Sequence, residues 1–357
     1  MEDQKRCLQM RRRLVALAIL LLIAIPASAE LFLDRPLGGR GRFTYSDFCS
    51  QSEIVSGGGC TYAFSVRGRL VSTNASPGTL TRFSDSATHT VTYAGPSFKV
   101  NVADATSFCL GNIGTTSTIT VPNGLSATQY NDCGWSRVVD QNGSGCKPTQ
   151  ATRTNMPFFQ VRVVDGESAL VQTIRGNSVT ASGPFGSRWL FATGCTNISG
   201  TGPKTLVELT SNAYFSGCCG LFGAGETVPH AVPGTMYAGA VYTTGGQHFW
   251  LIDGEAGGTC QHGSSAISVS PVIDSVGIGT FGGSGNPLSN YWWNNVQTCT
   301  NDTFQFTINT QTGMNLGISG DHAVAGPYYF RDVVLLAWGT STVAGLANTI
   351  YNYMIAL

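Results

Sequence analysis

The sequence is poor in charged residues. Only 11% of its 357 residues are charged, and the two signs balance at 20 Lys/Arg and 20 Asp/Glu. A partner with a phosphate backbone or an anionic membrane surface usually requires a basic patch, which this composition does not supply. We therefore expect neither nucleic acid nor a membrane as the partner of the mature chain. Surfaces rich in hydroxyl and amide groups are instead typical of extracellular β-proteins.

Long apolar runs are also missing, except for one at the N-terminus. A basic stretch that includes Arg11–Arg13 precedes an apolar run from Leu14 to Ile25, and Ala27-Ser28-Ala29 offers a small-residue cleavage site. This order predicts a secretory signal peptide over 1–29, followed by one secreted domain over 30–357. The run is short for a bilayer span, although an uncleaved anchor would produce the same pattern. Five Lys/Arg and two Asp/Glu fall in 1–29, so the mature net charge is near −3.

Several motifs that define enzyme and metal sites are absent. The sequence contains no C-x-x-C pair, no G-x-S-x-G nucleophile elbow and no glycine loop that ends in Lys-Ser/Thr. These absences argue against a zinc site, a serine hydrolase of that type and a phosphate-binding loop. We expect neither a metal nor an organic cofactor.

Ten cysteines follow the leader, and an even number in an exported chain predicts disulfides. Cys218 and Cys219 are adjacent, so a bond between them would close a strained eight-membered ring. From the residues alone, separate partners for each cysteine are favoured over that bond. Glycosylation is possible in a eukaryotic host, because N-x-S/T triplets occur at Asn74, Asn142, Asn197 and Asn301.

Helix signals are sparse, whereas short β-prone runs recur between Gly, Pro, Asn and Ser residues. This pattern predicts an all-β sandwich of the jelly-roll type. One helix is expected at the C-terminus, capped by Ser341 and carrying apolar residues through Met354 at i, i+3, i+4 spacing. The expected strands are Thr90–Tyr93, Phe98–Val102, Ser117–Val121, Phe158–Val164, Ala169–Ile174, Trp189–Ala192, Thr205–Leu209, Met236–Thr243, His248–Ile252, Ala266–Val272, Thr303–Ile308 and Tyr328–Trp338.

Two acidic segments are the candidate chemistry. Asp253 and Glu255 follow an apolar strand and alternate to the same face. Burying carboxylates there costs free energy unless they are paired or used, although an exposed strand end entering a glycine turn would look the same. Asp321 follows Gly320 at a second predicted turn, where a simple turn aspartate is the alternative. Two carboxylates across a cleft suffice for glycoside hydrolysis.

The ordered set of segments resembles the catalytic domain of α-L-arabinofuranosidase B, glycoside hydrolase family 54. The segment Cys218–Thr227 is similar to the family's Cys-Cys-x-x-x-Gly-x-x-Glu-Thr, and Trp250–Glu255 to its strand ending in Asp-x-Glu. Val139–Gly145 is similar to its Tyr-Asp-Gln-Ser-Gly-Asn-Gly, and Leu316–Asp321 to its Leu-Gly-Ile-Gly-Gly-Asp. The resemblance extends over nearly all of the predicted mature chain and implies a concanavalin-like β-sandwich.

The resemblance also implies residue roles. Glu255 would be the nucleophile and Asp321 the acid/base of a retaining glycosidase. The family's vicinal disulfide would correspond to Cys218–Cys219, which becomes the favoured pairing and would form a floor under the sugar. Asp253 and Gly320 would line the same site. The family's N-terminal bridged pair matches Cys49 and Cys60.

Departures from the family pattern leave a second function open. Ala256 and Gly257 stand where the family has an Asn-Asn pair that lines the sugar site, and the family's arabinose-binding β-trefoil has no counterpart. Five cysteines also lack counterparts; Cys133–Cys146 and Cys260–Cys299 are plausible extra disulfides. We therefore expect a monomeric, secreted enzyme that acts on arabinose-containing polysaccharide. The alternatives are a non-catalytic carbohydrate-binding or cell-surface sandwich from the same family and, less favoured, a structural secreted protein.

Overall fold

The structure is a computed structural model of the chain. All residues it describes belong to the compact unit Thr44–Leu357. They are residues 48–71, 76–95, 98–120, 126–163, 165–172, 190–192, 194–195, 204–211, 217–226, 236–242, 247–252, 258–261, 275–281, 289–293, 296–301, 313–316, 328–336 and 340–356.

Strands dominate these residues. The elements, in chain order, are η2 (Phe48–Ser50), α2 (Ser52–Ser56), β1 (Cys60–Ser65), β2 (Gly78–Arg82), β3 (Thr88–Thr90), β4 (Tyr93–Ala94), β5 (Lys99–Val100), α3 (Val102–Leu110), β6 (Thr116–Thr120), β7 (Ser126–Val138), η4 (Arg153–Asn155), β8 (Phe158–Arg162), β9 (Ser168–Gln172), β10 (Leu190–Ala192), β11 (Lys204–Ser211), β12 (Gly217–Glu226), β13 (Met236–Tyr242), β14 (Gln247–Ile252), β15 (Gly258–Gln261), β16 (Ser275–Phe281), β17 (Ser289–Trp293), β18 (Val296–Asn301), β19 (Gly313–Leu316), β20 (Tyr328–Leu336) and α4 (Thr340–Ala356).

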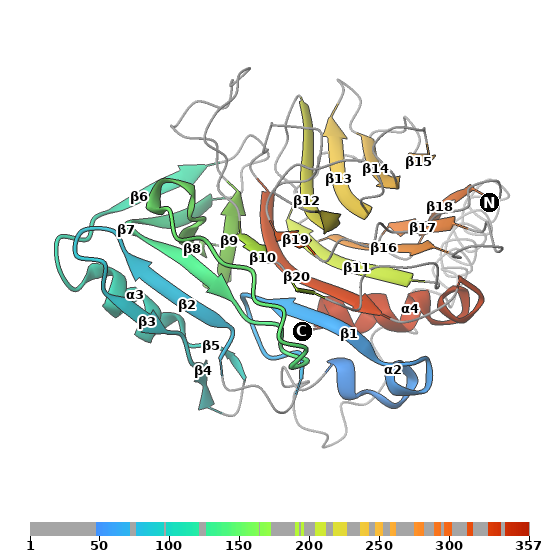
Figure 1. The fold of residues 1–357 in the computed structure, drawn as a ribbon, viewed down its shortest axis with the longest axis horizontal. Coiled ribbons are helices and arrows are strands. Elements are labelled where there is room, and N and C mark those ends of the chain that lie inside the picture. Colours follow the sequence, from blue (N-terminus) through green and yellow to red (C-terminus); the bar gives the residue numbers. More distant parts are fainter. Residues whose placement is uncertain are drawn as a thin grey trace, which may run out of the picture. The chain divides into compact units, whose positions relative to one another are not determined.

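Two large sheets form the architecture (Figure 1). The larger has twelve strands, ordered β18-β17-β16-β11-β20-β9-β8-β7-β2-β3, with β1 also on β20 and β6 also on β7. The second has six strands, ordered β10-β19-β12-β13-β14-β15. Every described strand pair is antiparallel. The predicted all-β sandwich with a C-terminal helix is confirmed.

Strand β11 separates two hydrophobic cores because its side chains alternate between faces. Val207 and Leu209 pack in one cluster with Ile350 and Met354 of α4. Leu206 points the other way and joins a cluster that includes Leu316 of the six-stranded sheet. One face of the large sheet is therefore covered by α4, and the opposite face packs toward the second sheet.

Helix α4 is amphipathic, as its sequence spacing predicts. Ala347, Ile350 and Met354 are buried at i, i+3 and i+7, while Gly345 and Ile355 are exposed. The helix begins at Thr340, so the predicted capping residue Ser341 lies inside the first turn. At the other end, the buried Arg67 donates from Nη2 to the Met354 carbonyl at 2.8 Å. A cation at a helix C-terminus satisfies a carbonyl that has no partner within the helix.

Several elements were not expected, among them the strands β1, β2, β7, β12 and β15 to β19 and the helices α2 and α3. The long strand β7 is missing from the predicted set, because Gly134 and Asn131 interrupt its β-prone residues. Helix α3 replaces the end of the strand predicted over Phe98–Val102; the Asn101 side chain accepts from the Asp104 N–H and caps the helix. The strand predicted over Thr90–Tyr93 is also wrong, since β3 ends at Thr90 and β4 begins at Tyr93. Those predicted over Ala266–Val272 and Thr303–Ile308 lie outside the described residues.

Glu208 is a fully buried carboxyl group on β11. It pairs with Gly277 of β16 and Val333 of β20, and alternation puts it on the same strand face as Leu206. Burial raises the pKa of Glu208 to about 8. The cause is desolvation, which disfavours the ionised form.

We predict that Glu208 makes the folded state less stable as pH rises. Below pH 4.5 the carboxyl is protonated in both states, whereas between pH 4.5 and about 8 only the unfolded state readily ionises. The free energy of unfolding should therefore fall across this window by up to a few kcal/mol, at about 1.4 kcal/mol per pKa unit. Urea unfolding at pH 5, 7 and 9 measures this, and Glu208→Gln should flatten the profile.

The matched control is Glu53→Gln, because Glu53 has an exposed side chain on α2. This substitution should leave the fall in stability between pH 5 and 9 in place. Parallel pH profiles for Glu208→Gln and the parent protein would contradict the prediction.

Candidate functional site

Five of the predicted site residues follow two strands of the six-stranded sheet, β14 and β19. Asp253, Glu255 and Ala256 lie in 253–257, between β14 and β15, and Gly320 and Asp321 lie in 317–327, after β19. Both segments are outside the described residues. The strands that lead into them are described, so the sheet determines where each segment starts.

Register places these two starting points near one another. Ile252, the last residue of β14, pairs with Met236, which pairs with Ala224 of β12. Leu316, the last residue of β19, pairs with Phe222, two positions away on β12. Since β14 and β19 are three strand steps apart, their ends are separated by about 14 Å across the sheet and about 7 Å along it.

The lengths of the two segments allow their carboxylates to meet. Strands β14 and β19 run antiparallel, so the chain leaves them in opposite directions along the strand axis. Five residues from Leu316 to Asp321 reach at most about 17 Å, and three from Ile252 to Glu255 at most about 10 Å. Together these lengths exceed the separation of the strand ends.

Cys218 and Cys219 occupy the start of β12 and pair with Val241 and Ala240 of β13. Ala240 lies four positions along β13 from Met236, which pairs with the end of β14. The dipeptide is therefore about 13 Å along the strands from that end. Strand β19 runs toward the cysteines, and β14 runs away from them. Of the two segments, therefore, only the one that follows β19 leaves its strand in the direction of the dipeptide. A bond between the two cysteines stays a prediction.

Three disulfides lie within the described residues. Cys49–Cys60 is confirmed, and the other two join Cys109 to Cys133 and Cys146 to Cys195.

The predicted Cys133–Cys146 bond is therefore wrong. Strand β7 continues for five residues beyond Cys133, about 17 Å, before the chain turns, whereas bridged Cα atoms lie within about 7 Å. Cys133 instead meets Cys109 on α3, which packs on β7. Cys260–Cys299 stays a prediction; β15 and β18, which carry them, contact one another.

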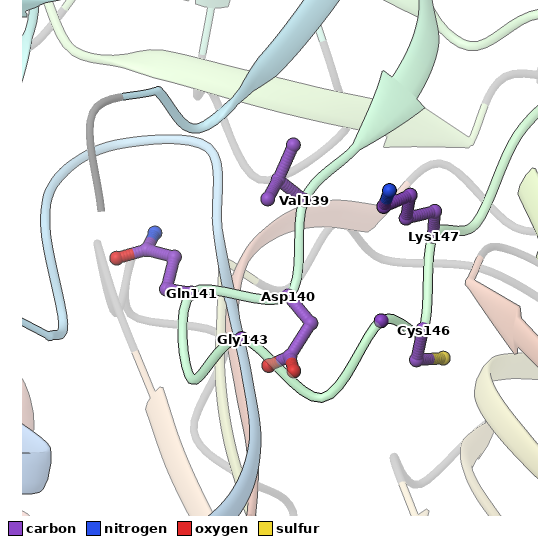
Figure 2. A pocket seen from close by; sticks show the side chains of 7 residues that line it. Val139, Asp140, Gln141, Gly143, Cys146 and Lys147 are labelled. Atoms are coloured by element: carbon purple, nitrogen blue, oxygen red, sulfur yellow. The ribbon is translucent and has the colours of Figure 1, made fainter. Parts of the chain in front are cut away.

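The segment around Asp140, which resembles a family motif, has a structural role. We call it the Asp140 clamp because its buried carboxylate binds three backbone N–H groups. The Asp140 carboxylate is 2% exposed and accepts the N–H groups of Ala63 (2.8 Å), Asn142 (3.1 Å) and Ser144 (2.8 Å). Figure 2 shows the carboxylate inside the loop between Gln141 and Cys146. Three backbone donors stabilise a buried charge, and the Ala63 contact holds β1 in place.

Gln141 strengthens the same clamp. Its Oε1 accepts from Leu70 N at 2.6 Å, and its Nε2 donates to the Gly68 carbonyl at 3.1 Å. A hollow of about 330 Å³ borders this loop, lined by Val139, Asp140, Gln141, Gly143, Gly145, Cys146 and Lys147. Because both buried side chains already bind the backbone, we assign the hollow no chemistry.

Several buried ionisable residues were not predicted from the sequence: Arg67, Asp132, Arg162, Lys204 and Glu208. Glu208 interrupts the apolar run Leu206–Leu209, and a lone carboxylate inside a predicted strand was the available signal. Among the described residues, no group of three or more His, Cys, Asp or Glu side chains could hold a metal ion. No helix in the described part of the chain is long and apolar enough to cross a membrane.

Comparisons with known proteins support the fold through structure and not through sequence. No family model and no curated protein sequence matches the chain. Three solved structures share its fold. They are a mutant glycoside hydrolase family 54 α-L-arabinofuranosidase soaked with 4-nitrophenyl α-L-arabinofuranoside (15% identity, TM-score 0.59), an arabinofuranosidase complexed with arabinofuranosyl-α-1,2-xylobiose (15%, 0.58) and a family 54 enzyme soaked with a cyclic sulfate inhibitor (16%, 0.58).

The structural match covers 87% of this chain and 65% of each of those three chains. The chain thus spans about 65% of the length of the structures that it resembles. At this level of identity the likeness concerns the path of the backbone. The chain has a β-sandwich fold distantly similar to that of family 54 arabinofuranosidases.

A matched pair of aspartate substitutions tests the clamp. Asp140→Asn replaces one carboxylate oxygen with an NH₂ group that faces a backbone donor, so we predict a loss of about 1–3 kcal/mol in the free energy of unfolding. Asp85→Asn is the control, because Asp85 pairs with Arg82 at the surface and contributes little. Urea unfolding measures both. Equal effects of the two substitutions would contradict the clamp.

Proposed function

We propose that this chain is a secreted, retaining glycoside hydrolase that releases α-L-arabinofuranosyl or related furanosyl residues from polysaccharide. The observation that carries the proposal is the backbone fold, which over 87% of the chain is similar to that of arabinofuranosidases crystallised with arabinofuranosides. The acidic segments after β14 and β19 of one sheet add support. Export rests on the pattern of residues 1–29.

Two carboxylates would divide the reaction. Glu255 attacks the anomeric carbon while Asp321 protonates the departing glycosidic oxygen, which leaves a glycosyl ester on Glu255. Asp321 then takes a proton from water, which attacks the same carbon and frees Glu255. Two inversions give net retention, and they require carboxyl groups about 5–5.5 Å apart.

The remaining predicted residues would bind the sugar. Asp253 would accept a hydroxyl hydrogen bond or orient the nucleophile, and Gly320 would let the chain approach the ring. Cys218 and Cys219 would form an apolar floor. Ala256 offers no hydrogen bond where the family has an amide, so we expect a change in sugar preference. No metal or organic cofactor enters these steps.

A second candidate is a non-catalytic carbohydrate-binding sandwich. The observation that favours it is Ala256-Gly257 in place of an amide pair. This candidate predicts affinity for arabinan without turnover.

The proposal predicts distinct losses from two substitutions. Glu255→Gln should abolish release of 4-nitrophenol from 4-nitrophenyl α-L-arabinofuranoside, because no glycosyl ester can form. Asp321→Ala should lower turnover by about 10²–10⁴-fold, the usual contribution of acid–base catalysis. Added azide should restore turnover in Asp321→Ala, because it attacks the ester without a general base, and it should release a retained glycosyl azide.

Aryl xyloside and galactofuranoside serve as specificity controls for the same proteins. A folded wild-type protein that binds arabinan but turns over none of these substrates would contradict the enzyme and support the binding sandwich. Unchanged turnover in either variant would contradict the assigned role of that residue.

A further inference from the structure

The short strand β10 supports the strand that leads to Asp321. It forms the outer edge of the six-stranded sheet, and Leu190 pairs with Leu316, the last residue of β19. The next two residues, Phe191 and Ala192, pair with Asn315 and Met314. The position of β10 therefore bears directly on the point from which the Gly320–Asp321 segment leaves the sheet.

A second set of contacts joins β10 to the twelve-stranded sheet. Thr149 donates its N–H to the Phe191 carbonyl at 2.8 Å and accepts from the Phe191 N–H at 2.9 Å. Thr149 also forms a bridge with Arg137 of β7 on its other side. The segment around Thr149 thus runs between β7 and β10 and makes the two sheets continuous there. We call this connection the junction.

A disulfide closes the same junction. Cys146 lies three residues before Thr149, and Cys195 lies three residues after Ala192. Both are buried, with 1% and 0% exposure, and their Cα atoms are 4.9 Å apart. The bond and the Thr149 bridge tie this one short strand to the same segment, 146–149. A three-residue strand has few contacts of its own to keep it in place.

We propose that Thr149, Phe191 and the bonded pair Cys146 and Cys195 are positioning residues for the segment that carries the acid/base Asp321. This inference rests on the proposed function. They fix β10, which fixes the end of β19 and hence the starting point of the chain that carries Asp321. Proton donation to a leaving group depends steeply on distance, and a misplacement of about 1 Å costs about 10²-fold in rate. Glu255 follows β14, three strands further from the junction, and is less affected.

The test is the dependence of kcat/KM on the leaving group. We compare Cys146→Ser/Cys195→Ser with the parent on 2,4-dinitrophenyl α-L-arabinofuranoside, which leaves without protonation, and on 4-methoxyphenyl α-L-arabinofuranoside, which requires it. The double variant should lose about 10–100-fold on the methoxyphenyl substrate and less than about threefold on the dinitrophenyl substrate. Equal loss on both substrates would overturn the inference, since general destabilisation lowers both.

Two further proteins complete this comparison. Cys109→Ser/Cys133→Ser removes a disulfide that joins α3 to β7, away from β10, and should leave the ratio of the two rates unchanged. Thr149→Pro removes the N–H and the hydroxyl that bond to the Phe191 carbonyl and leaves the disulfide in place, so it opens the junction by a second route if the first double variant does not fold. A changed ratio in the Cys109/Cys133 control, or an unchanged ratio in Thr149→Pro, would count against the junction.

Hydrogen–deuterium exchange separates this inference from the proposed function, because it requires no turnover. Opening the junction should speed exchange in β10 and β19 and leave β16 and β17, near the far end of the twelve-stranded sheet, unchanged. Unchanged exchange in β10 and β19 would overturn the positioning role even in an active enzyme. Exchange in those strands could become faster while the parent protein turns over no furanoside. That result would show that the junction stabilises β10 and β19, and it would reject both the proposed function and the positioning of an acid.

Discussion

The antiparallel register of β19, β12, β13 and β14 is the constraint on which the account of this protein depends. It sets the two ends that lead to the candidate carboxylates three strands apart and two positions out of line. Those ends point in opposite directions, so the sheet supplies a frame and the following segments must complete the site. Contacts at the outer strands of the six-stranded sheet, such as the junction between β10 and β7, therefore affect where the candidate segments begin.

Local patterns were enough to predict much of the fold. Alternation and turn residues identified β11, β13, β14 and β20 to within a few residues, and apolar spacing identified α4. They failed where tertiary contacts decide the outcome. Strand β7 contains Gly134, yet partners on both sides keep it extended. Helix α3 is short and depends on its Asn101 cap and on Cys109.

The candidate site could be predicted by residue type but not by arrangement. Asp253, Glu255 and Asp321 stand out because carboxylates beside apolar strands are costly unless they are used. Their approach depends on pairings between segments far apart in the chain, which no local pattern encodes. Cys133 illustrates the same limit, since its partner Cys109 is fixed by the packing of α3 on β7. Glu208 was overlooked because one charge in an apolar run carries no spacing signal.

Covalent trapping of the nucleophile tests the central claim most directly. A cyclic sulfate of arabinofuranose configuration is an electrophile that a correctly placed carboxylate opens, which leaves a stable ester. Peptide mass spectrometry of the treated protein should find one adduct, on the peptide that contains Glu255, and excess arabinofuranoside should slow its formation. A folded protein that forms no adduct, or forms one only at a carboxylate elsewhere, would contradict the account.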